Sequence, residues 1–227
     1  MSALRRRLVR GAVLALALGS LAACGREVRR TTYAGGKPWS EVRFKDGLPD
    51  GQWRTWWENG QLKSEGGYRA GEMDGPWRTW FEDGAPQTEQ LFAGGRPEGL
   101  WKHFYKDGHV VTEGSYEGGQ KVGWWREWYG DGTLKAEGEF KDGIATGTAT
   151  VFFPDGRPKT RTRFDQNGAS EYMELWNDTG QIWSRAEGPI RNDHRHGAWT
   201  VYNQDGTVNA EHSGTYVDDV LVKDGEK

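Results

Sequence analysis

The chain has 227 residues, of which 35% are hydrophobic and 13% aromatic, with 13 tryptophans and 34 glycines. It contains a single cysteine, so no disulfide can form within the chain, and its formal net charge is −3. This composition leaves little apolar material for a second structural layer, and the negative charge argues against a nucleic-acid partner, which selects clustered basic residues.

The N-terminal residues have the pattern of an export signal. Four arginines between residues 5 and 10 precede an uncharged run of small and apolar residues over 11–23. The run is shorter than the roughly 20 residues of a bilayer-spanning helix and is typical of a signal peptide. It ends in Leu21-Ala22-Ala23-Cys24, which resembles the lipobox of bacterial lipoproteins. We therefore expect residues 1–23 to be removed and Cys24 to anchor the chain to a membrane through lipid.

Removal of this segment changes the charge. It holds four of the 30 basic residues and none of the 33 acidic ones, which leaves 26 against 33 and a net charge of −7. That charge opposes attraction to anionic lipid. In the lipoproteins that this start resembles, the residue after the cysteine often acts as a sorting signal, and Gly25-Arg26 lacks the acidic residue linked to inner-membrane retention. We expect the protein in the bacterial cell envelope, at the outer membrane if the host has two.

Beyond residue 33 a 24-residue repeat dominates the sequence. An aromatic residue recurs at this spacing, at Phe44, Tyr68, Phe92, Tyr116, Phe140 and Phe164. Seven residues later stands a glycine, at Gly51, Gly75, Gly99, Gly123 and Gly147. Two positions on, a tryptophan follows in four units, at Trp53, Trp77, Trp101 and Trp125. Each unit continues with an aromatic pair and an Asn-Gly or Asp-Gly step.

Each unit is predicted to be a β-hairpin. Steps such as Asn59-Gly60 are strong hairpin signals, because a type I′ turn needs positive φ at both central residues. Links such as Asp46-Gly47 are again turn-like, and no apolar period of 3.6 residues predicts a helix. The expected fold is all-β, an elongated single-layer antiparallel meander of about seven 24-residue β-hairpin repeats and about fourteen strands. The glycines are expected to adopt positive φ in turns or to leave room for a ring on the backbone.

The repeat weakens toward the C-terminus. The sixth unit has Glu171 in place of the glycine, and the seventh is displaced by two residues but keeps Trp199 and Asp205-Gly206. The predicted organisation is a signal peptide over 1–23, a short linker over 24–32, the repeat array over 33–220 and a polar tail over 221–227. Charged residues of the tail would protect the array from edge pairing.

The unit FKDGLPDGQWRTWWENGQLKSEGGY, residues 44–68, closely resembles the MORN-repeat variant of bacterial proteins. The resemblance covers nearly all of residues 33–220 and implies consecutive β-hairpins in one twisted sheet. Many members of the family carry the label of antitoxin in a toxin–antitoxin pair, of the YwqK type. Neutralising a cytosolic toxin needs a cytosolic protein, so a lipid-anchored member could meet a toxin only in the envelope or at the cell surface.

No catalytic residue, cofactor or metal site is predicted. His194 and His196 would share one face of an extended strand, which leaves a metal pair or solvated loop histidines as alternatives, and the second is favoured. The carboxylates Glu65, Glu89, Glu113 and Glu137 recur once per unit, whereas paired catalytic carboxylates would be unique. They are expected to pair across strands with Lys63, Arg78, Lys102 or Arg126, at about 0.2–1 kcal/mol each.

The aromatic pairs carry the functional interpretation. Neighbouring residues of a strand point to opposite faces, so a single layer cannot bury both rings of a pair. The second rings are expected to be the more exposed, and they form the candidate binding face: Trp57, Phe81, Tyr105, Tyr129 and Phe153. The other interpretation, which is favoured, is that all rings pack between units. The favoured function is an envelope-anchored protein-interaction scaffold, of which an antitoxin- or immunity-like protein is one form; the alternative is a module that binds carbohydrate or cell-wall polysaccharide.

Overall fold

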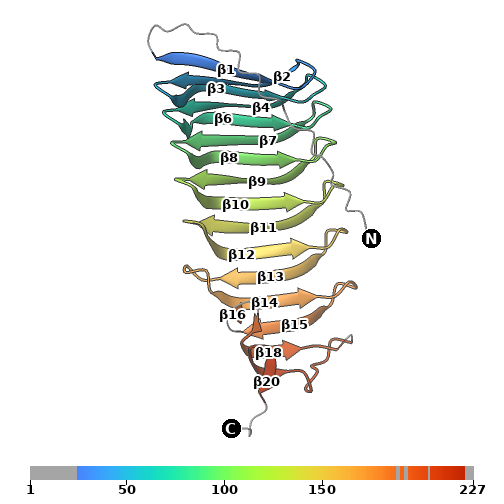
Figure 1. Cartoon of the computed structure of the whole chain (residues 1–227). Coiled ribbons are helices and arrows are strands. Elements are labelled where there is room, and N and C mark those ends of the chain that lie inside the picture. Colours follow the sequence, from blue (N-terminus) through green and yellow to red (C-terminus); the bar gives the residue numbers. More distant parts are fainter. Residues whose placement is uncertain (1–24, 188–189, 192–193, 204, 223–227) are drawn as a thin grey trace, which may run out of the picture. The chain divides into compact units, whose positions relative to one another are not determined.

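The structure is a computed structural model that describes residues 25–187, 190–191, 194–203 and 205–222 (Figure 1). The predicted signal peptide and Cys24 lie outside these residues. The described part is built of strands and turns without a helix, which confirms the all-β prediction. None of its segments is a helix long and apolar enough to cross a membrane.

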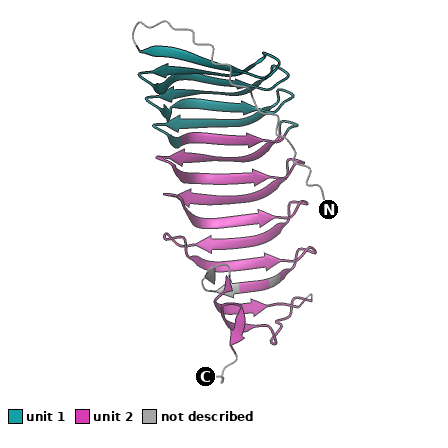
Figure 2. Cartoon of the chain, in the orientation of Figure 1, with its two compact units in different colours: residues 1–97, 106–108 teal, residues 98–105, 109–227 magenta. Residues whose placement is uncertain are grey.

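The chain divides into two compact units, unit 1 with residues 1–97 and 106–108 and unit 2 with residues 98–105 and 109–227 (Figure 2). Within each unit, strands that follow one another along the chain pair antiparallel, as predicted for a meander of hairpins. The strands of unit 1 are β1 (Arg26–Thr32), β2 (Pro38–Lys45), β3 (Leu48–Trp56), β4 (Leu62–Arg69), β5 (Glu72–Met73), β6 (Gly75–Trp80) and β7 (Pro86–Ala93).

Unit 2 begins within β8, whose first two residues belong to unit 1. Its strands are β8 (Arg96–Phe104), β9 (Val110–Glu117), β10 (Gln120–Trp128), β11 (Leu134–Lys141), β12 (Ile144–Phe152), β13 (Pro158–Phe164), β14 (Ser170–Trp176), β15 (Ile182–Glu187), β16 (Ile190–Arg191), β17 (His194–Arg195), β18 (Gly197–Val201), β19 (Gly214–Val217) and β20 (Val220–Val222). Strands β16 and β17 pair only with each other, so β15 continues the meander through β18.

Residues 26–32, which the sequence predicted to be a linker, form strand β1 instead. The strand pairs with β2 over a register that starts at Arg26 opposite Lys45. A hydrogen bond of 2.6 Å joins the Thr31 and Ser40 hydroxyls across the pair. The segment lacks the aromatic residues that mark the repeat in the sequence. It forms a strand because its backbone hydrogen-bonds to the N–H and C=O groups along the edge of β2.

The turns inside the hairpins differ from the predicted type I′ turns. At the first Asn-Gly step, the Trp57 N–H donates to the Gln61 carbonyl and the Gly60 N–H donates to the Trp57 carbonyl, both at 2.8 Å. Gly60 has a φ of 92°, whereas Asn59 does not have positive φ. This geometry is a three-residue loop with a type I turn and a glycine bulge. The same pair of hydrogen bonds recurs at Gly84, Gly132 and Gly156.

Type I′ geometry occurs instead in the links between hairpins. Asp46 and Gly47 have φ values of 51° and 82°, and they connect the paired residues Lys45 and Leu48. Two successive positive φ values define this tight turn, whose twist matches that of the flanking strands. The same pairs of positive φ occur at 70–71, 94–95, 118–119, 142–143 and 218–219. Turns are therefore where the sequence predicted them, but the type I′ geometry predicted for the Asn-Gly and Asp-Gly steps is found in the links instead.

Glycines of the strands make room for aromatic rings, as the sequence predicted. A Cβ atom added to Gly66 would lie 2.2 Å from the Trp77 ring, and one added to Gly114 would lie 2.1 Å from the Trp125 ring. Only glycine lets a ring lie this close to a neighbouring backbone. The other recurrent glycine, represented by Gly51, has a φ of 111° within β3 rather than in a turn.

Candidate functional site

The apolar core of unit 1 is one face of its sheet. The rings of Trp53, Tyr68, Trp77 and Phe92 follow one another, with successive centroid separations of 5.5, 5.3 and 6.3 Å. Trp77 is only 8% exposed, and its indole N–H donates to the Gly67 carbonyl at 3.1 Å. The other three rings are half-buried, and burial raises the pKa of Tyr68. We call this row of rings the aromatic face of unit 1.

Unit 2 has an equivalent aromatic face. The rings of Trp101, Tyr116, Trp125 and Phe140 follow one another at centroid separations of 4.8, 5.0 and 6.5 Å. Burial raises the pKa of Tyr116, and the Trp125 indole N–H donates to the Ser115 carbonyl at 3.2 Å. At the next step of the repeat the tryptophan is missing, because position 149 is an alanine.

The predicted binding face lies at the turn end of the hairpins. Each of its residues directly follows the last residue of a strand and begins the three-residue loop. All five are half-buried, as are their neighbours in the aromatic pairs, so the second ring of each pair is in the same exposure class as the first. The role of these five residues in binding stays a prediction: Trp57, Phe81, Tyr105, Tyr129 and Phe153.

Three of these rings hydrogen-bond to the next hairpin, in line with the interpretation that the rings pack between units. The Trp57 indole N–H donates to the Trp80 carbonyl at 3.1 Å. In unit 2 the Tyr105 hydroxyl donates to the Trp128 carbonyl at 3.0 Å, and the Tyr129 hydroxyl donates to the Phe152 carbonyl at 2.8 Å. Each donor lies 23 residues before its acceptor, so the aromatic pair joins one repeat to the next.

The Tyr129→Phe substitution tests this connection. It keeps the ring and removes the hydroxyl that donates to the Phe152 carbonyl, so we expect the free energy of unfolding to fall by about 1 kcal/mol. Urea titration followed by circular dichroism measures the change. Tyr105→Phe removes the equivalent bond and should cost a similar amount; no loss in either variant would contradict the structural role.

The recurrent carboxylates form ion pairs across the strands, as predicted. The nitrogen–oxygen distances are 3.1 Å for Arg54–Glu65, 3.9 Å for Arg78–Glu89, 3.4 Å for Lys102–Glu113 and 3.3 Å for Arg126–Glu137. The predicted partner Lys63 is wrong for Glu65, because the register places Arg54 directly opposite it. Lys63 instead lies 4.3 Å from the centre of the Trp57 ring. These partly exposed pairs stabilise the sheet only modestly.

One carboxylate is buried rather than exposed. Glu174 of β14 is 6% exposed and lies 2.8 Å from the guanidinium of Arg185 and 3.5 Å from that of Arg161. The Tyr172 hydroxyl also donates to it, and burial together with this carboxylate raises the pKa of Tyr172. With two cations and a hydroxyl as partners, the buried charge is compensated, and the cluster is structural.

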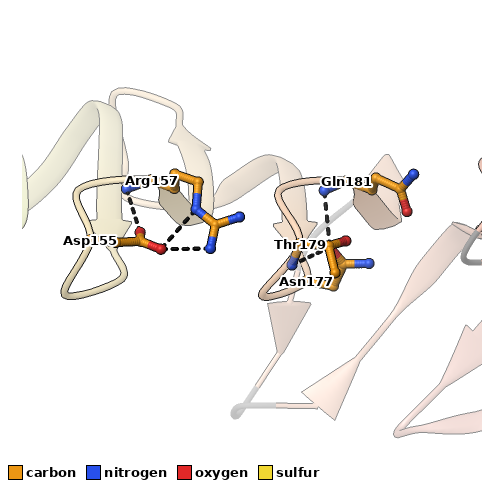
Figure 3. A network of polar contacts seen from close by, with 5 residues as sticks. All are labelled: Asp155, Arg157, Asn177, Thr179 and Gln181. Atoms are coloured by element: carbon orange, nitrogen blue, oxygen red, sulfur yellow. Dashed lines mark hydrogen bonds and ion pairs between the residues drawn. The ribbon is translucent and has the colours of Figure 1, made fainter.

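Aspartates and asparagines of the loops hold the turns by their side chains. The Asp155 carboxylate accepts from the Arg157 backbone N–H at 3.0 Å, and the Asn177 side-chain oxygen accepts from the Gln181 backbone N–H at 2.9 Å (Figure 3). The Arg157 guanidinium lowers the pKa of Asp155, and the Thr133 backbone N–H lowers the pKa of Asp131. Such local bonds are the reason that Asx residues favour turns.

These shifts predict how stability depends on pH. The folded pKa of Asp131 lies below its ordinary value of 3.8, so the ionised form is favoured by folding. Its contribution is present above pH 3.8 and is lost as the pH falls through the folded pKa. We expect the melting temperature to fall as the pH drops below about 4. The Asp131→Asn substitution keeps a hydrogen-bond acceptor, as Asn177 does naturally, but removes the ionisable group. It should reduce the fall in melting temperature between pH 4 and pH 2, which thermal melts at pH 2–7 measure. An unchanged fall would contradict the role given to Asp131.

The two histidines singled out by the sequence each lie beside an aspartate. His194 lies in β17, with its Nδ1 atom 2.6 Å from the Asp219 carboxylate, and His196 Nδ1 lies 3.8 Å from Asp218. The Arg195 backbone N–H and the His194 ring lower the pKa of Asp219 to about 2. Within the described residues, no group of three or more His, Cys, Asp or Glu side chains is arranged to hold a metal ion.

Three segments of the chain match the family model for the MORN repeat variant, at residues 49–70, 97–117 and 121–142. In these segments the MORN-variant repeats predicted from the sequence are confirmed. A comparison with curated proteins gives no match. Among solved structures, the crystal structure of TarM is similar at 14% sequence identity and a TM-score of 0.29, over 44% of this chain. The similarity spans only 19% of the TarM chain.

Proposed function

We propose that the chain is a non-catalytic protein-interaction scaffold that is anchored in the bacterial cell envelope through lipid on Cys24. The observation that carries the proposal is the half-buried aromatic face of each unit. Large described side chains with less than 2% exposure are absent, so the rings that form the core also form surface. Contiguous apolar surface of this kind marks interaction sites, and tryptophan and tyrosine are the residues that contribute most at protein interfaces.

The repeat supports the same function. Successive hairpins present the same groups at a regular spacing, and repeat arrays use such extended surfaces for binding. Ion pairs on the opposite face, such as Arg126–Glu137, keep that face polar and soluble. An immunity-like or toxin-neutralising protein would be one form of this scaffold, and it would require a partner located outside the cytoplasm.

The test is in-cell crosslinking of the tagged full chain, followed by mass spectrometry. We expect one protein at a stoichiometric yield. Lys121→Glu reverses a charge on the aromatic face of unit 2, where the ammonium lies 4.2 Å from the Trp125 ring centre, and should reduce the yield severalfold. Lys141→Glu makes the same change at a strand position that points to the other face and should have no effect.

A different outcome would favour the carbohydrate alternative. If no protein is crosslinked and the chain is retained on isolated peptidoglycan, the aromatic faces bind sugar rings and the scaffold proposal fails. The anchor has a separate test, because Cys24→Ala should leave the chain unprocessed and unlabelled by palmitate. Normal labelling of that variant would contradict lipidation at Cys24.

A further inference from the structure

The aromatic face of unit 2 contains a position where the repeat lacks its tryptophan. Four successive 24-residue repeats carry a tryptophan at this place, at 53, 77, 101 and 125, whereas the fifth repeat carries Ala149 in β12. Strand β11 lies next to β12 (Figure 1). Its Gly138 is still a glycine, like the platforms under Trp77 and Trp125. A Cβ atom added there would lie 3.1 Å from the Ala149 methyl group and 4.0 Å from the edge of the Phe140 ring, whereas at Gly66 and Gly114 it would overlap an indole.

The missing side chain leaves a hollow, which we call the Ala149 notch. It has a volume of about 260 Å³ and is lined by Trp125, Ala136, Gly138, Phe140, Ala149 and Val151 together with the polar residues Thr112, Lys121, Arg126, Glu127, Glu137 and Thr150. Arg126, Glu137 and Thr150 alternate along their strands with residues of the aromatic face, so their side chains point to the opposite face of the sheet. A cavity of roughly 150 Å³ with apolar walls accommodates benzene, so this one has room for a bicyclic ring.

We propose that the Ala149 notch binds an indole side chain presented by a partner protein. The chain itself supplies the evidence for this occupant, because Trp125 shows how an indole lies on a glycine platform of the same face. There the indole N–H donates to the carbonyl of the residue after the glycine, which is Ser115. The corresponding acceptor in the notch is the Glu139 carbonyl. An indole in the notch would continue the stack beyond Phe140.

The charges at the border fit the same occupant. The Lys121 ammonium lies 4.2 Å from the centre of the Trp125 ring and 5.2 Å from that of Phe140, so the site already contains a cation that associates with aromatic rings. Glu127 is engaged by Lys135 at 2.5 Å. A sugar ring would need several free polar side chains for its hydroxyl groups, whereas Glu127 is already paired with Lys135 and the Lys121 ammonium lies over two rings, so an indole is favoured over a saccharide.

This inference deepens the proposed function, because it names the group by which a protein partner would be recognised. Its test needs no partner. The ¹⁵N-labelled full chain in detergent micelles is titrated with N-acetyl-L-tryptophanamide and followed by NMR. We expect saturable shifts at the Gly138 and Ala149 amides, with a Kd on the order of 1 mM.

The decisive variant is Ala149→Trp, which fills the notch with the side chain that the other units carry. It should weaken binding of the probe at least tenfold while the melting temperature is retained or raised. Ala149→Leu is a smaller filling and should also weaken binding. Thr148→Trp adds the same side chain at the adjacent, exposed position, which points to the opposite face, and should leave binding unchanged.

Two results would overturn the proposal: binding of the probe by folded Ala149→Trp with wild-type affinity, or no shifts at these amides with N-acetyl-L-tryptophanamide. Shifts with the N-acetylglucosamine trimer in the second case would identify the notch as a saccharide site. The notch and the scaffold fail separately. If the probe does not bind but crosslinking still yields a Lys121-dependent partner, only the notch is wrong. If the probe binds and no partner is recovered, the scaffold is wrong.

Discussion

The Gly114→Ala substitution should lower the free energy of unfolding by about 3 kcal/mol, because it forces a methyl group into a ring. The new Cβ atom would lie 2.1 Å from Cδ2 of Trp125, far inside van der Waals contact. The ring cannot simply move aside, since its N–H is bonded to the Ser115 carbonyl and Tyr116 packs at 5.0 Å. Urea denaturation followed by near-ultraviolet circular dichroism measures both the stability and the packing of the rings.

A matched control is Gly130→Ala. An added Cβ atom there meets nothing within 4 Å, and the residue does not have positive φ. The substitution should leave stability unchanged or raise it slightly, because alanine restricts the unfolded chain. The double variant Gly114→Ala/Trp125→Leu should recover part of the loss, as expected for two residues that contact each other. Equal stability of Gly114→Ala and Gly130→Ala would show that Gly114 is not a ring platform.

The hairpin repeat could be predicted because its signals are local and periodic. A glycine such as Gly66 recurs at a fixed distance from the preceding tryptophan. The sequence of one repeat therefore suggests that it either adopts positive φ or leaves room for a ring. The cross-strand partners of Glu89, Glu113 and Glu137 also follow from the spacing within one hairpin. The pairing of Glu65 was wrongly predicted, because two cations, Lys63 and Arg54, are near it in sequence and only the register distinguishes them.

The turn types could not be assigned because one dipeptide suits two geometries. Asn59-Gly60 can occupy a type I′ turn or the end of a three-residue loop, where only the glycine needs positive φ. The choice depends on which residues pair before the turn, and here Trp57 bonds to Gln61. At Asp46-Gly47 the strands pair up to the turn itself, so both residues take positive φ.

Contacts between repeats were the least predictable part of the candidate site. The bond from the Trp57 indole to the Trp80 carbonyl joins residues 23 apart, and although packing of the rings between units was one interpretation, the sequence does not identify the backbone carbonyl that the ring reaches. The Ala149 notch did have a signal in the sequence, since alanine breaks a series of four tryptophans. That signal becomes a candidate site only when the strands are paired and Gly138 is seen to lie opposite Ala149 without an indole above it.

The Trp77→Ala substitution should lower the free energy of unfolding by about 3 kcal/mol, at the lower end of the range for removing a buried tryptophan. The ring is 8% exposed and packs against Trp53, Tyr68 and Phe92 at 6.4, 5.3 and 6.3 Å. Water can enter the vacated space from the open face of the single layer, which limits the cost of the cavity. Trp39→Ala, at a residue that is 37% exposed, should cost less than about 1 kcal/mol.

The location of the loss distinguishes a repeat array from a domain with one shared core. Because each hairpin packs mainly on its neighbours, removal of Trp77 should weaken protection from hydrogen exchange in β3, β4, β6 and β7 and leave the later strands of unit 2, such as β13 and β14, unchanged. Mass spectrometry of exchanged peptides measures each strand separately. A uniform loss of protection along the chain would instead mean that the hairpins fold as one cooperative core, and the aromatic faces would then act as a single structural element.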